Sequence, residues 1–584
     1  MNAINTENRY HDVLIIGSGG SGLAAALFAA DKNLDVAVIS KVHPLKSHTI
    51  AAQGGINASL GNISRDDWRW HAYDTIKASD WLADQDSVEE MCKSAPEMIN
   101  MLDQLGVEFD RTKSGLINQK IYGGQSTEFG KGEFAHRACY SQDKTGDSIM
   151  NKLFKAAQGK KVSFYNYNFA IDLIMRDNQC HGVICWDIEN GILNIIRANN
   201  VIIATGGYSQ IYATATSSAI CTGDGNGLVL RAGISLQDME FIQFHPTALS
   251  KIGILITEAA RSAGGRLLNA KGERFMKKYA PKFLELAARD VVARAIAAEI
   301  NNGDGCGIDK DHVLLDLTHL SEDEIKAQLP TIFENCSSFA KISPSKQPIP
   351  IAPAAHYTMG GIPTDSNCQV VKYSNSQTTK IAGLYAIGEA ACISVHGASR
   401  LGCNSLLDLL VFAKKAIESL QDKNSSEFEF VDHKKIISNF NKIFVGKYTN
   451  IEQITKQMKN VMSNYVGVFR NKEGLTYALS ELTRLQKIYE NLTISDKSLV
   501  WNIDLQHYFE LGNMLSSAII TTRLALFRQE SRGAHWRQDY QDKDNNFHGH
   551  SICHINTNLE QILLRPVRAS AKNVDFYQPT SRNY

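Results

Sequence analysis

The sequence carries no net charge, no paired-cysteine motif and no long apolar run. Its 584 residues include 61 Lys and Arg against 61 Asp and Glu, so the formal net charge is zero. Nucleic-acid binding needs a net basic face against phosphate, and this composition gives it no support. The 11 cysteines are scattered without one Cys-x-x-Cys, so no spacing is typical of zinc or an iron–sulfur cluster. We expect no metal site and no nucleic-acid partner, and any one-electron carriers would lie on another chain.

The amino terminus lacks the features of a targeting segment. The first 11 residues are polar, without an apolar signal core or an Arg-rich amphipathic presequence. No apolar run approaches the ~20 residues that cross a bilayer. We therefore expect a soluble cytoplasmic polypeptide that reaches a membrane only through partners. Buried thiols in a reducing compartment fit the same expectation.

A glycine-rich turn lies close to the start of the chain. A buried strand, the turn, a helix and a second strand follow one another over residues 12–16, 17–22, 23–30 and 35–39. This order is typical of a dinucleotide-binding βαβ unit. We expect Gly17 to permit the tight turn, Gly19 to let a pyrophosphate approach, and Gly22 to let the helix pack on the strand. The helix N-terminus then offers amide donors to the phosphates.

The second strand departs from the usual dinucleotide pattern. An acidic residue normally follows it and binds the adenosine ribose, but here Ser40-Lys41 stands at that point. The departure argues against NAD and leaves open how a ribose is held. Two further strand-like runs, 200–205 and 383–387, each lead into a glycine. We expect both to join the same nucleotide sheet, with a long insertion between them.

The segment Ser47-His48-Thr49-Ile-Ala-Ala-Gln53-Gly54-Gly55 carries the first specific resemblance. It resembles the flavinylation segment of the flavoprotein subunits of succinate dehydrogenases and fumarate reductases. In that family the matching histidine is bonded to the 8α-methyl group of the flavin. The resemblance implies FAD as the cofactor, attached covalently through His48.

The resemblance extends over nearly the whole chain. The further matching stretches are Gly123-Gly124-Gln125-Ser126, Thr222-Gly-Asp224-Gly, Gln243-Phe-His245-Pro-Thr247, Thr257-Glu258-Ala-Ala-Arg261, Ala288-Arg289-Asp290, His356-Tyr-Thr-Met-Gly-Gly361, Gly397-Ala-Ser-Arg400-Leu-Gly-Cys403-Asn404-Ser405-Leu406, Arg528-Gln-Glu-Ser-Arg532-Gly-Ala-His535 and Arg582-Asn-Tyr584. They occur in the family's order, so the chain is identified as a member of the family.

The implied fold is of the α/β class. A FAD-binding dinucleotide (Rossmann-like) domain would hold an inserted α+β capping domain, followed by a C-terminal helical domain and a small C-terminal tail region. The FAD-binding domain is expected at 1–237 and 356–430, and the capping domain at 238–355. The helical domain, whose sequence has helical period from about 435 onward, is expected at 431–540 and the loop-rich tail region at 541–584.

Two details favour a succinate dehydrogenase over its relatives. Fumarate reductases usually read Ala-Glu-Gly-Gly after the flavin histidine and lack a Gly-Gly-Gln-Ser segment, whereas this sequence has Gln53 and Gln125-Ser126. L-aspartate oxidases share the Arg-Asp and His-Tyr-x-Met-Gly-Gly elements but lack the covalent histidine. A flavin-binding scaffold without catalysis would show gaps among the site residues. Two departures remain, namely Cys403 where the family usually has Gly, beside the flavin contacts, and Ala259-Ala260 in place of Gly-Cys.

The resemblance implies oxidation of succinate to fumarate. Succinate carries two carboxylates, and arginine binds a carboxylate with two parallel hydrogen bonds. By the resemblance, one carboxylate is held by Arg400 and His356, and the other is contacted by His245 and Thr257. The same site catalyses both directions, so fumarate reduction stays open as the physiological reaction.

The implied proton acceptor is the arginine that matches Arg289. Burial and a second guanidinium nearby would disfavour its charged form. Glu258 and Arg261 lie three positions apart, one helical turn, so their side chains share a face. We expect this pair to relay the proton from Arg289 to solvent.

The implied FAD contacts are spread over the chain. They are Gly17, Gly19, Gly20, Gly22, Ser40, Lys41, His48, Thr49, Gln53, Gly54, Gly55, Asp224, Glu389, Ser405 and Leu406. The implied partners are the iron–sulfur and membrane-anchor subunits of respiratory complex II, which pass electrons to a quinone, and a flavinylation assembly factor. The implied location is the cytoplasmic face of the bacterial inner membrane.

Overall fold

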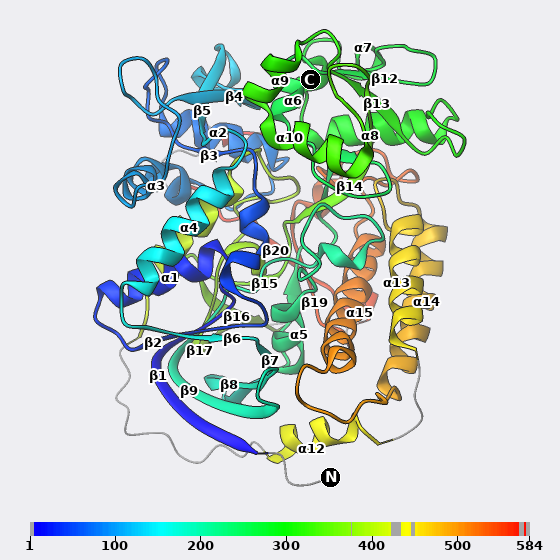
Figure 1. Cartoon of the computed structure of the whole chain (residues 1–584). Coiled ribbons are helices and arrows are strands. Elements are labelled where there is room, and N and C mark those ends of the chain that lie inside the picture. The colour runs from blue at the N-terminus through cyan, green and yellow to red at the C-terminus, as the bar shows by residue number, and fades with distance from the viewer. Residues whose placement is uncertain are drawn as a thin grey trace.

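The computed structural model describes residues 5–374, 377–421, 434–445, 450–556, 558–570 and 577–579. The expected domain boundary at 430–431 and the terminal Arg582-Asn-Tyr584 lie outside these residues. An eight-stranded sheet forms the centre of the molecule, in the order β16-β17-β8-β9-β1-β2-β6, with β7 paired to β8 (Figure 1). Its strands are β1 (Thr6–Ile16), β2 (Val36–Ser40), β6 (Val162–Asn166), β7 (Asn168–Arg176), β8 (Gln179–Asp187), β9 (Ile192–Ile203), β16 (Gln369–Tyr373) and β17 (Thr378–Ala386).

The parallel part of this sheet contains the strands expected from the sequence. β1 pairs in parallel with β2 and with β9, and β9 pairs in parallel with β17. The prediction that the runs 200–205 and 383–387 join the nucleotide sheet is therefore confirmed. β1 begins earlier than expected, because its exposed first half, Thr6–Tyr10, pairs with β9 although it buries no apolar side chain.

The two faces of the sheet bury two separate cores. Alternate residues of a strand point to opposite faces, so Val13 and Ile15 join one core while Leu14 and Ile16 join the other. The helices on the first face are α1 (Gly20–Asp31), α2 (Trp68–Ala78), α3 (Gln85–Gln104), α4 (Thr145–Gln158) and α11 (Ser405–Glu418). Smaller elements of this half are β3 (Ile56–Asn57), β4 (Gln119–Ser126) and β5 (Phe134–Cys139), whereas the paired β15 (Ile362–Pro363) and β18 (Ala391–Cys392) contact the other core.

The helical C-terminal segment packs on the second face. Its helices are α12 (Lys434–Lys442), α13 (Ile451–Tyr465), α14 (Lys472–Glu490) and α15 (Ile503–Phe527), and α5 (Asp224–Arg231) lies against α15. α13, α14 and α15 lie side by side along one edge of the molecule (Figure 1). Buried leucine and methionine side chains of these helices join the core that holds Leu14 and Ile16.

The inserted segment forms a second sheet with its own core. The sheet has the order β11-β14-β13-β12, from β11 (Ile242–Leu249), β12 (Arg266–Leu268), β13 (Val313–Asp316) and β14 (Ile349–Thr358). Its helices are α6 (Ala259–Ser262), α7 (Met276–Tyr279), α8 (Arg289–Asn301), α9 (Glu322–Gln328) and α10 (Pro330–Asn335). A cluster running from Leu249 to Ile351 supplies the core. This inserted unit lies beyond the carboxyl ends of the central strands (Figure 1).

The expectation of a loop-rich C-terminal tail is only partly right. Two strands, β19 (Gly549–Cys553) and β20 (Leu563–Pro566), form a three-stranded sheet with β10 (Leu236–Gln237). β19 is fully buried although its sequence is short and mixed, because it lies between the neighbouring β20 and the distant β10.

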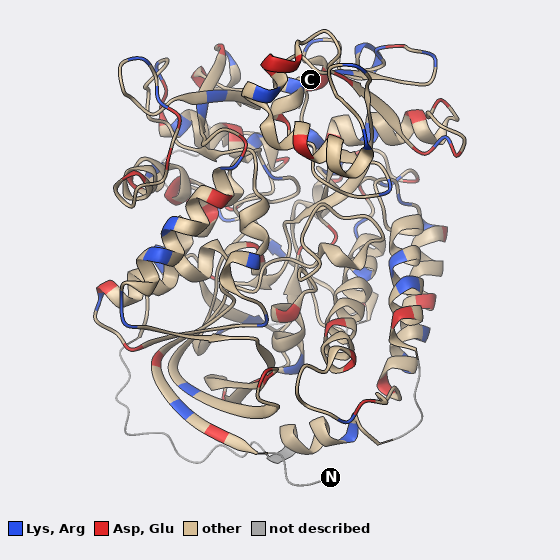
Figure 2. Ribbon diagram, in the orientation of Figure 1, with Lys and Arg blue, Asp and Glu red and all other residues tan. Residues whose placement is uncertain are grey.

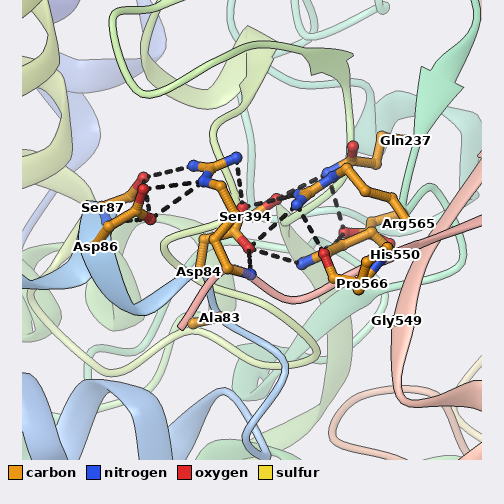
Figure 3. Close-up of polar contacts among 12 residues, drawn as sticks. Ala83, Asp84, Asp86, Ser87, Gln237, Ser394, Gly549, His550, Arg565 and Pro566 are labelled. Carbon is orange, nitrogen blue, oxygen red and sulfur yellow. Dashed lines mark hydrogen bonds and ion pairs between the residues drawn. The ribbon is translucent and has the colours of Figure 1, made fainter. Parts of the chain in front are cut away.

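A buried group of charges fastens this tail to α3. Asp84 accepts hydrogen bonds from Arg565 at 2.8 Å and lies 2.9 Å from Arg568 Nη1. His550 lies between two carboxylates, 2.6 Å from Asp238 and 3.3 Å from Asp84. We call Asp84, Asp238, His550, Arg565 and Arg568 the anchor cluster, and Figure 3 shows Asp84 surrounded by His550 and Arg565.

The charge distribution, the helices and the cysteines of the structure can be compared with what the sequence indicated. Acidic and basic residues are interspersed along the ribbon (Figure 2). Across the described ranges, no helix combines the length and apolar character that a membrane span needs. All 11 cysteines fall in described positions and are buried free thiols.

Candidate active site

The glycine-rich turn has the close approaches that require glycine. Gly17 has φ of 111°, and a Cβ there would lie 2.3 Å from the Ala204 carbonyl oxygen. A Cβ on Gly22 would lie 1.9 Å from the Gly17 carbonyl oxygen, so the helix packs as closely on the turn as the sequence predicted. α1 starts at Gly20 without a side-chain cap, and the Gly20 N–H donates to Thr49 Oγ1 at 3.1 Å. The start of α1 is thus suited to phosphate.

A first cavity opens at this helix start. Among the expected FAD contacts, those that line it are Gly17, Gly19, Gly20, Ser40, Lys41, His48, Thr49, Asp224 and Glu389. Gly22 is the exception in this part of the chain, because it packs against Gly17 instead. An elongated nucleotide with its phosphates at α1 fits this set of glycines, hydroxyls and acids.

Lys41 explains the missing acid at the end of β2. Its Nζ lies 2.8 Å from Asp224 Oδ2 and 2.7 Å from Glu510 Oε1. Burial alone would lower the pKa of Lys41, but the two carboxylates raise it above its usual value. Lys41 therefore holds Asp224 at the cavity wall, so an acid does line this cavity, but from α5 rather than from the strand. Glu510, on α15, was not foreseen from the sequence.

A second cavity continues from the first. The expected FAD contacts that line it are His48, Thr49, Gln53, Gly54, Gly55, Glu389, Ser405 and Leu406. The expected substrate residues His245, Thr257, Arg289, His356 and Arg400 line the same cavity. His48, Thr49 and Glu389 belong to both cavities, so they mark the junction.

His48 at this junction is a neutral imidazole. It begins a short helical turn, and its Nδ1 accepts a hydrogen bond from the Ser218 N–H at 3.2 Å. Burial lowers the pKa of His48 to about 4. Nδ1 is therefore occupied, and Nε2 is the nitrogen left for another bond.

Two arginines reach one glutamine in the second cavity. Gln243 Oε1 accepts from Arg400 Nη2 at 3.0 Å and from Arg289 Nη1 at 3.4 Å. The Arg400 guanidinium also stacks over the Tyr357 ring, 4.4 Å from its centroid. Burial and the nearby Arg289 lower the pKa of Arg400 to about 10. The site thus concentrates positive charge in a buried place.

Two histidines also line the second cavity. The rings of His245 and His356 lie 4.9 Å apart, with Nδ1 of His356 2.7 Å from Thr216 Oγ1. The pKa values of both histidines fall well below 6.5, through burial first and then through neighbouring Arg289 and Arg400. Both rings are neutral at pH 7 and can donate to a carboxylate through the nitrogen that faces the cavity.

Glu258 and Arg261 lie behind Arg289, outside the cavity lining. Arg289 Nε donates to Glu258 Oε2 at 2.9 Å, and Arg261 Nη2 lies 3.5 Å from the same oxygen. Burial would raise the pKa of Glu258, but Arg261 and Arg289 outweigh it and lower the value. Burial and Arg289 lower the pKa of Arg261. We call His245, Glu258, Arg261, Arg289, His356 and Arg400 the substrate cluster.

Sequence reasoning missed two residues of this site. Gln243 stands two positions before His245 in β11, a spacing that puts both on one face of a strand and could have revealed it. Tyr357 gives no such signal, since its contact with Arg400 depends on the fold. Cys403 lines the second cavity, as expected of a residue beside the flavin contacts, and its φ is 66°.

Comparison with known proteins finds similarity to flavoproteins along most of the chain. A model of the FAD binding domain matches residues 12–406, and a model of the fumarate reductase flavoprotein C-terminus matches residues 455–584. The chain is 48% identical to a succinate dehydrogenase flavoprotein subunit of Rickettsia bellii over 91% of each chain. It is 40% identical to the 8-methylmenaquinol:fumarate reductase flavoprotein subunit of Wolinella succinogenes, over 94% of this chain and 89% of that one.

A solved structure shares the complete fold. The E. coli quinol fumarate reductase superposes with a TM-score of 0.90 at 32% identity, covering 99% of both chains. The expected α/β fold with an inserted unit and a C-terminal helical unit is therefore confirmed. The chain belongs to the family of succinate dehydrogenase and fumarate reductase flavoprotein subunits.

Proposed function

We propose that this FAD-dependent oxidoreductase oxidises succinate to fumarate as the flavoprotein subunit of a succinate dehydrogenase. One observation carries the proposal: the nucleotide cavity runs into a second cavity whose wall holds Arg289, Arg400, His245 and His356. A dicarboxylate is the ligand that this charge and these donors suit. The 48% identity to a succinate dehydrogenase flavoprotein subunit supports the same reading.

In this proposal each side chain of the second cavity has one task. Arg400 and His356 hold one carboxylate, and His245 and Thr257 contact the other. Bound FAD supplies the acceptor for the hydride that leaves one methylene. Gln243 keeps Arg400 and Arg289 in fixed orientations through its shared oxygen.

Arg289 would take the proton from the neighbouring methylene. A guanidinium about six pK units above neutrality costs roughly 8 kcal/mol to deprotonate in water. Positive charges that lie close together in a largely buried site disfavour one another. The lowered pKa values of Arg261 and Arg400 show this crowding. The contact of Arg289 with Glu258 gives the proton its next position, and Arg261 follows.

His48 is proposed as the covalent attachment point of FAD, through Nε2. Its position where the two cavities meet and the occupied Nδ1 support this assignment. Denatured, acid-precipitated protein should keep flavin fluorescence on the polypeptide band, and His48→Ser should release the flavin under the same treatment. Flavin that washes off the wild-type chain in acid would remove the assignment.

The proposed partners are an iron–sulfur subunit and membrane anchors that lead to a quinone, at the cytoplasmic face of a bacterial inner membrane. The absence of any Cys-x-x-Cys supports a separate electron carrier, and a flavinylation assembly factor completes the set. The flavin-loaded chain alone should reduce an artificial dye with succinate and fail to reduce quinone. Efficient quinone reduction by the chain alone would overturn this division of labour.

Fumarate reduction is the second candidate, because the chain resembles fumarate reductases along its whole length. The ratio of dye reduction by succinate to fumarate reduction by reduced dye separates the two. We expect oxidation to be the faster reaction. A ratio that strongly favours fumarate reduction would assign the chain to the second candidate.

A further inference from the structure

The segment Arg532–Trp536 follows α15 and has no role in the site as described so far. It forms a tight turn, in which the Arg532 N–H donates to the His535 carbonyl at 2.9 Å and the His535 N–H returns to Arg532 at 3.0 Å. Gly533 has φ of 56°, in the left-handed region that favours glycine. The turn is almost entirely buried, so its contacts are interior contacts.

The turn binds the loop that carries Arg400. The Ala534 N–H donates to the Ala398 carbonyl at 2.9 Å, two residues before Arg400. A Cβ on Gly533 would lie 2.4 Å from the same carbonyl oxygen, so only glycine permits this approach. Ala534 also shares an apolar cluster with Tyr357, whose ring supports the Arg400 guanidinium. The turn therefore fixes the backbone just before Arg400.

The same turn binds the helix that begins at Arg289. Arg294 of α8 donates through Nη1 to the Gly533 carbonyl at 2.9 Å, and its guanidinium lies 4.7 Å from the centroid of the Trp536 ring. Its Nη2 pairs with Asp290 at 3.1 Å, next to Arg289. A helix is stiff over five residues, so the position of Arg294 sets the position of Arg289.

Buried polar contacts hold the turn itself in place. The Gly533 N–H donates to Asp80 Oδ2 at 2.9 Å, and Arg532 binds Glu530 with two bonds of 2.8 Å. His535 accepts from Arg470 at Nδ1, 2.8 Å away, and Nε2 lies 3.1 Å from the Arg528 carbonyl. Paired buried charges of this kind are costly to disturb, so the turn is a rigid reference point.

We propose that the turn Arg532–Trp536 is a positioning element that sets the separation of Arg289 from Arg400, with Arg294 as its link to α8. The two arginines repel one another and lie on different units, one on the inserted unit and one on the loop before α11. Their spacing must nevertheless match one small substrate. Arg294 and Gly533 touch neither substrate nor flavin, so they act as positioning residues. The inference rests on the proposed function, which gives the two arginines their tasks.

The test compares Arg294→Met with Arg266→Met in the full-length, flavin-loaded chain. Arg266 is an exposed arginine of the same inserted unit and serves as the control. Arg294→Met should lower kcat by about tenfold or more, because a displacement near 1 Å can cost two orders of magnitude. Malonate affinity, flavin content and melting temperature should stay close to those of the wild type. Arg294→Lys keeps a donor and a cation over Trp536, and should recover most of the lost kcat.

Three outcomes decide the inference. A kcat for Arg294→Met equal to that of Arg266→Met would overturn it. Parallel losses of kcat, malonate affinity and melting temperature, without recovery in Arg294→Lys, would show a purely structural role and overturn it as well. Turnover is measured in both directions with succinate and fumarate. A wild-type chain that turns over neither would refute the proposed function and the inference together, whereas normal wild-type turnover isolates the inference.

Discussion

The substrate cluster and the anchor cluster are both buried groups of charges, yet they differ in the ratio of acidic to basic side chains. In the anchor cluster Asp84 and Asp238 face two arginines and a histidine, and the neighbouring Asp86 supplies a third carboxylate to Arg568, so acids and basic groups are equal in number. The substrate cluster contains one carboxylate, Glu258, and three arginines, two of which have lowered pKa values. Balanced charge fastens parts of the chain together, whereas surplus positive charge suits a dicarboxylate substrate.

Histidine shows the same contrast. His550 in the anchor cluster has a raised pKa, because Asp238 and Asp84 outweigh the effect of burial. His245 in the substrate cluster has a pKa well below 6.5, because burial and Arg289 act in the same direction. The surroundings thus favour the charged form of histidine in one cluster and the neutral form in the other.

The largest effect is expected at Arg289. Arg289→Lys keeps the charge but ends short of the guanidinium position, and a general base must be within hydrogen-bond reach of its proton. Turnover with a dye acceptor should fall on the order of a thousandfold. Malonate, titrated through the flavin spectrum, should bind within about tenfold of wild type, because Arg400 and the two histidines remain. Near-normal turnover with badly weakened malonate binding would reassign Arg289 to substrate holding.

Asp84→Asn should unbalance the anchor cluster and cost stability instead of turnover. Removing one partner from a buried ion pair costs about 3–5 kcal/mol, and Asp84 has three cationic neighbours. Denaturant unfolding would measure the change. Asp86→Asn is the matched control, because Asp86 also binds Arg568 but is 39% exposed, and should cost below about 1 kcal/mol. Equal costs for the two variants would contradict the role given to the anchor cluster.

The pH dependence of stability should reveal His550. A raised pKa contributes stability that is fully present below the unfolded value near 6.5 and is lost as pH rises through the folded value. The difference in unfolding free energy between wild type and His550→Gln should therefore be largest at pH 6 and shrink toward pH 9. A difference that grows with pH would mean that His550 is neutral in the folded chain.

The smallest effect is expected for Cys403→Gly. The φ of 66° strains any residue with a Cβ, by about 1 kcal/mol, but the thiol also packs on Tyr122 and Ala138. The two terms oppose each other, so the unfolding free energy should change by less than about 1 kcal/mol. Cys403→Ala removes the sulfur at the same φ and isolates the packing term. If the Cys403→Gly variant is no more stable than Cys403→Ala, the positive φ at position 403 does not strain the folded chain.

Local sterics made the first half of the site predictable. Gly22 is required by its approach to Gly17, a few positions earlier, and Gly17 by its own positive φ, so both glycines could be predicted from the local sequence, although the backbone that Gly17 approaches, at Ala204, is distant in the sequence. The runs 12–16, 35–39, 200–205 and 383–387 of the central sheet were equally predictable, because each is mostly apolar and buried, whereas β6, β7, β8 and β16 were not predicted. β19 was not predicted either, since its burial depends on β10, more than three hundred residues away along the chain, as well as on the neighbouring β20.

The rest of the site depends on contacts between residues that are far apart in the sequence, and these could not be predicted from the sequence. Lys41 and Glu510 are separated by 469 positions, and no pattern in either segment indicates that the two side chains are in contact. The resemblance to a family located His245, Arg289 and Arg400, but it did not show that Gln243 joins the two arginines. Charge balance in the anchor cluster also depends on the folded arrangement of Asp84 and His550.

The Lys41–Glu510 contact also bears on the order in which the nucleotide cavity is completed during synthesis of the chain. The glycine turn and His48 leave the ribosome early, and the whole substrate cluster follows well before α15 (Ile503–Phe527). Lys41 contacts both Asp224, at the nucleotide cavity, and Glu510 of α15, so its complete set of partners exists only once α15 has been made. We therefore expect chains that end before α15 to retain less flavin than the full-length chain, which flavin fluorescence of truncated chains would measure.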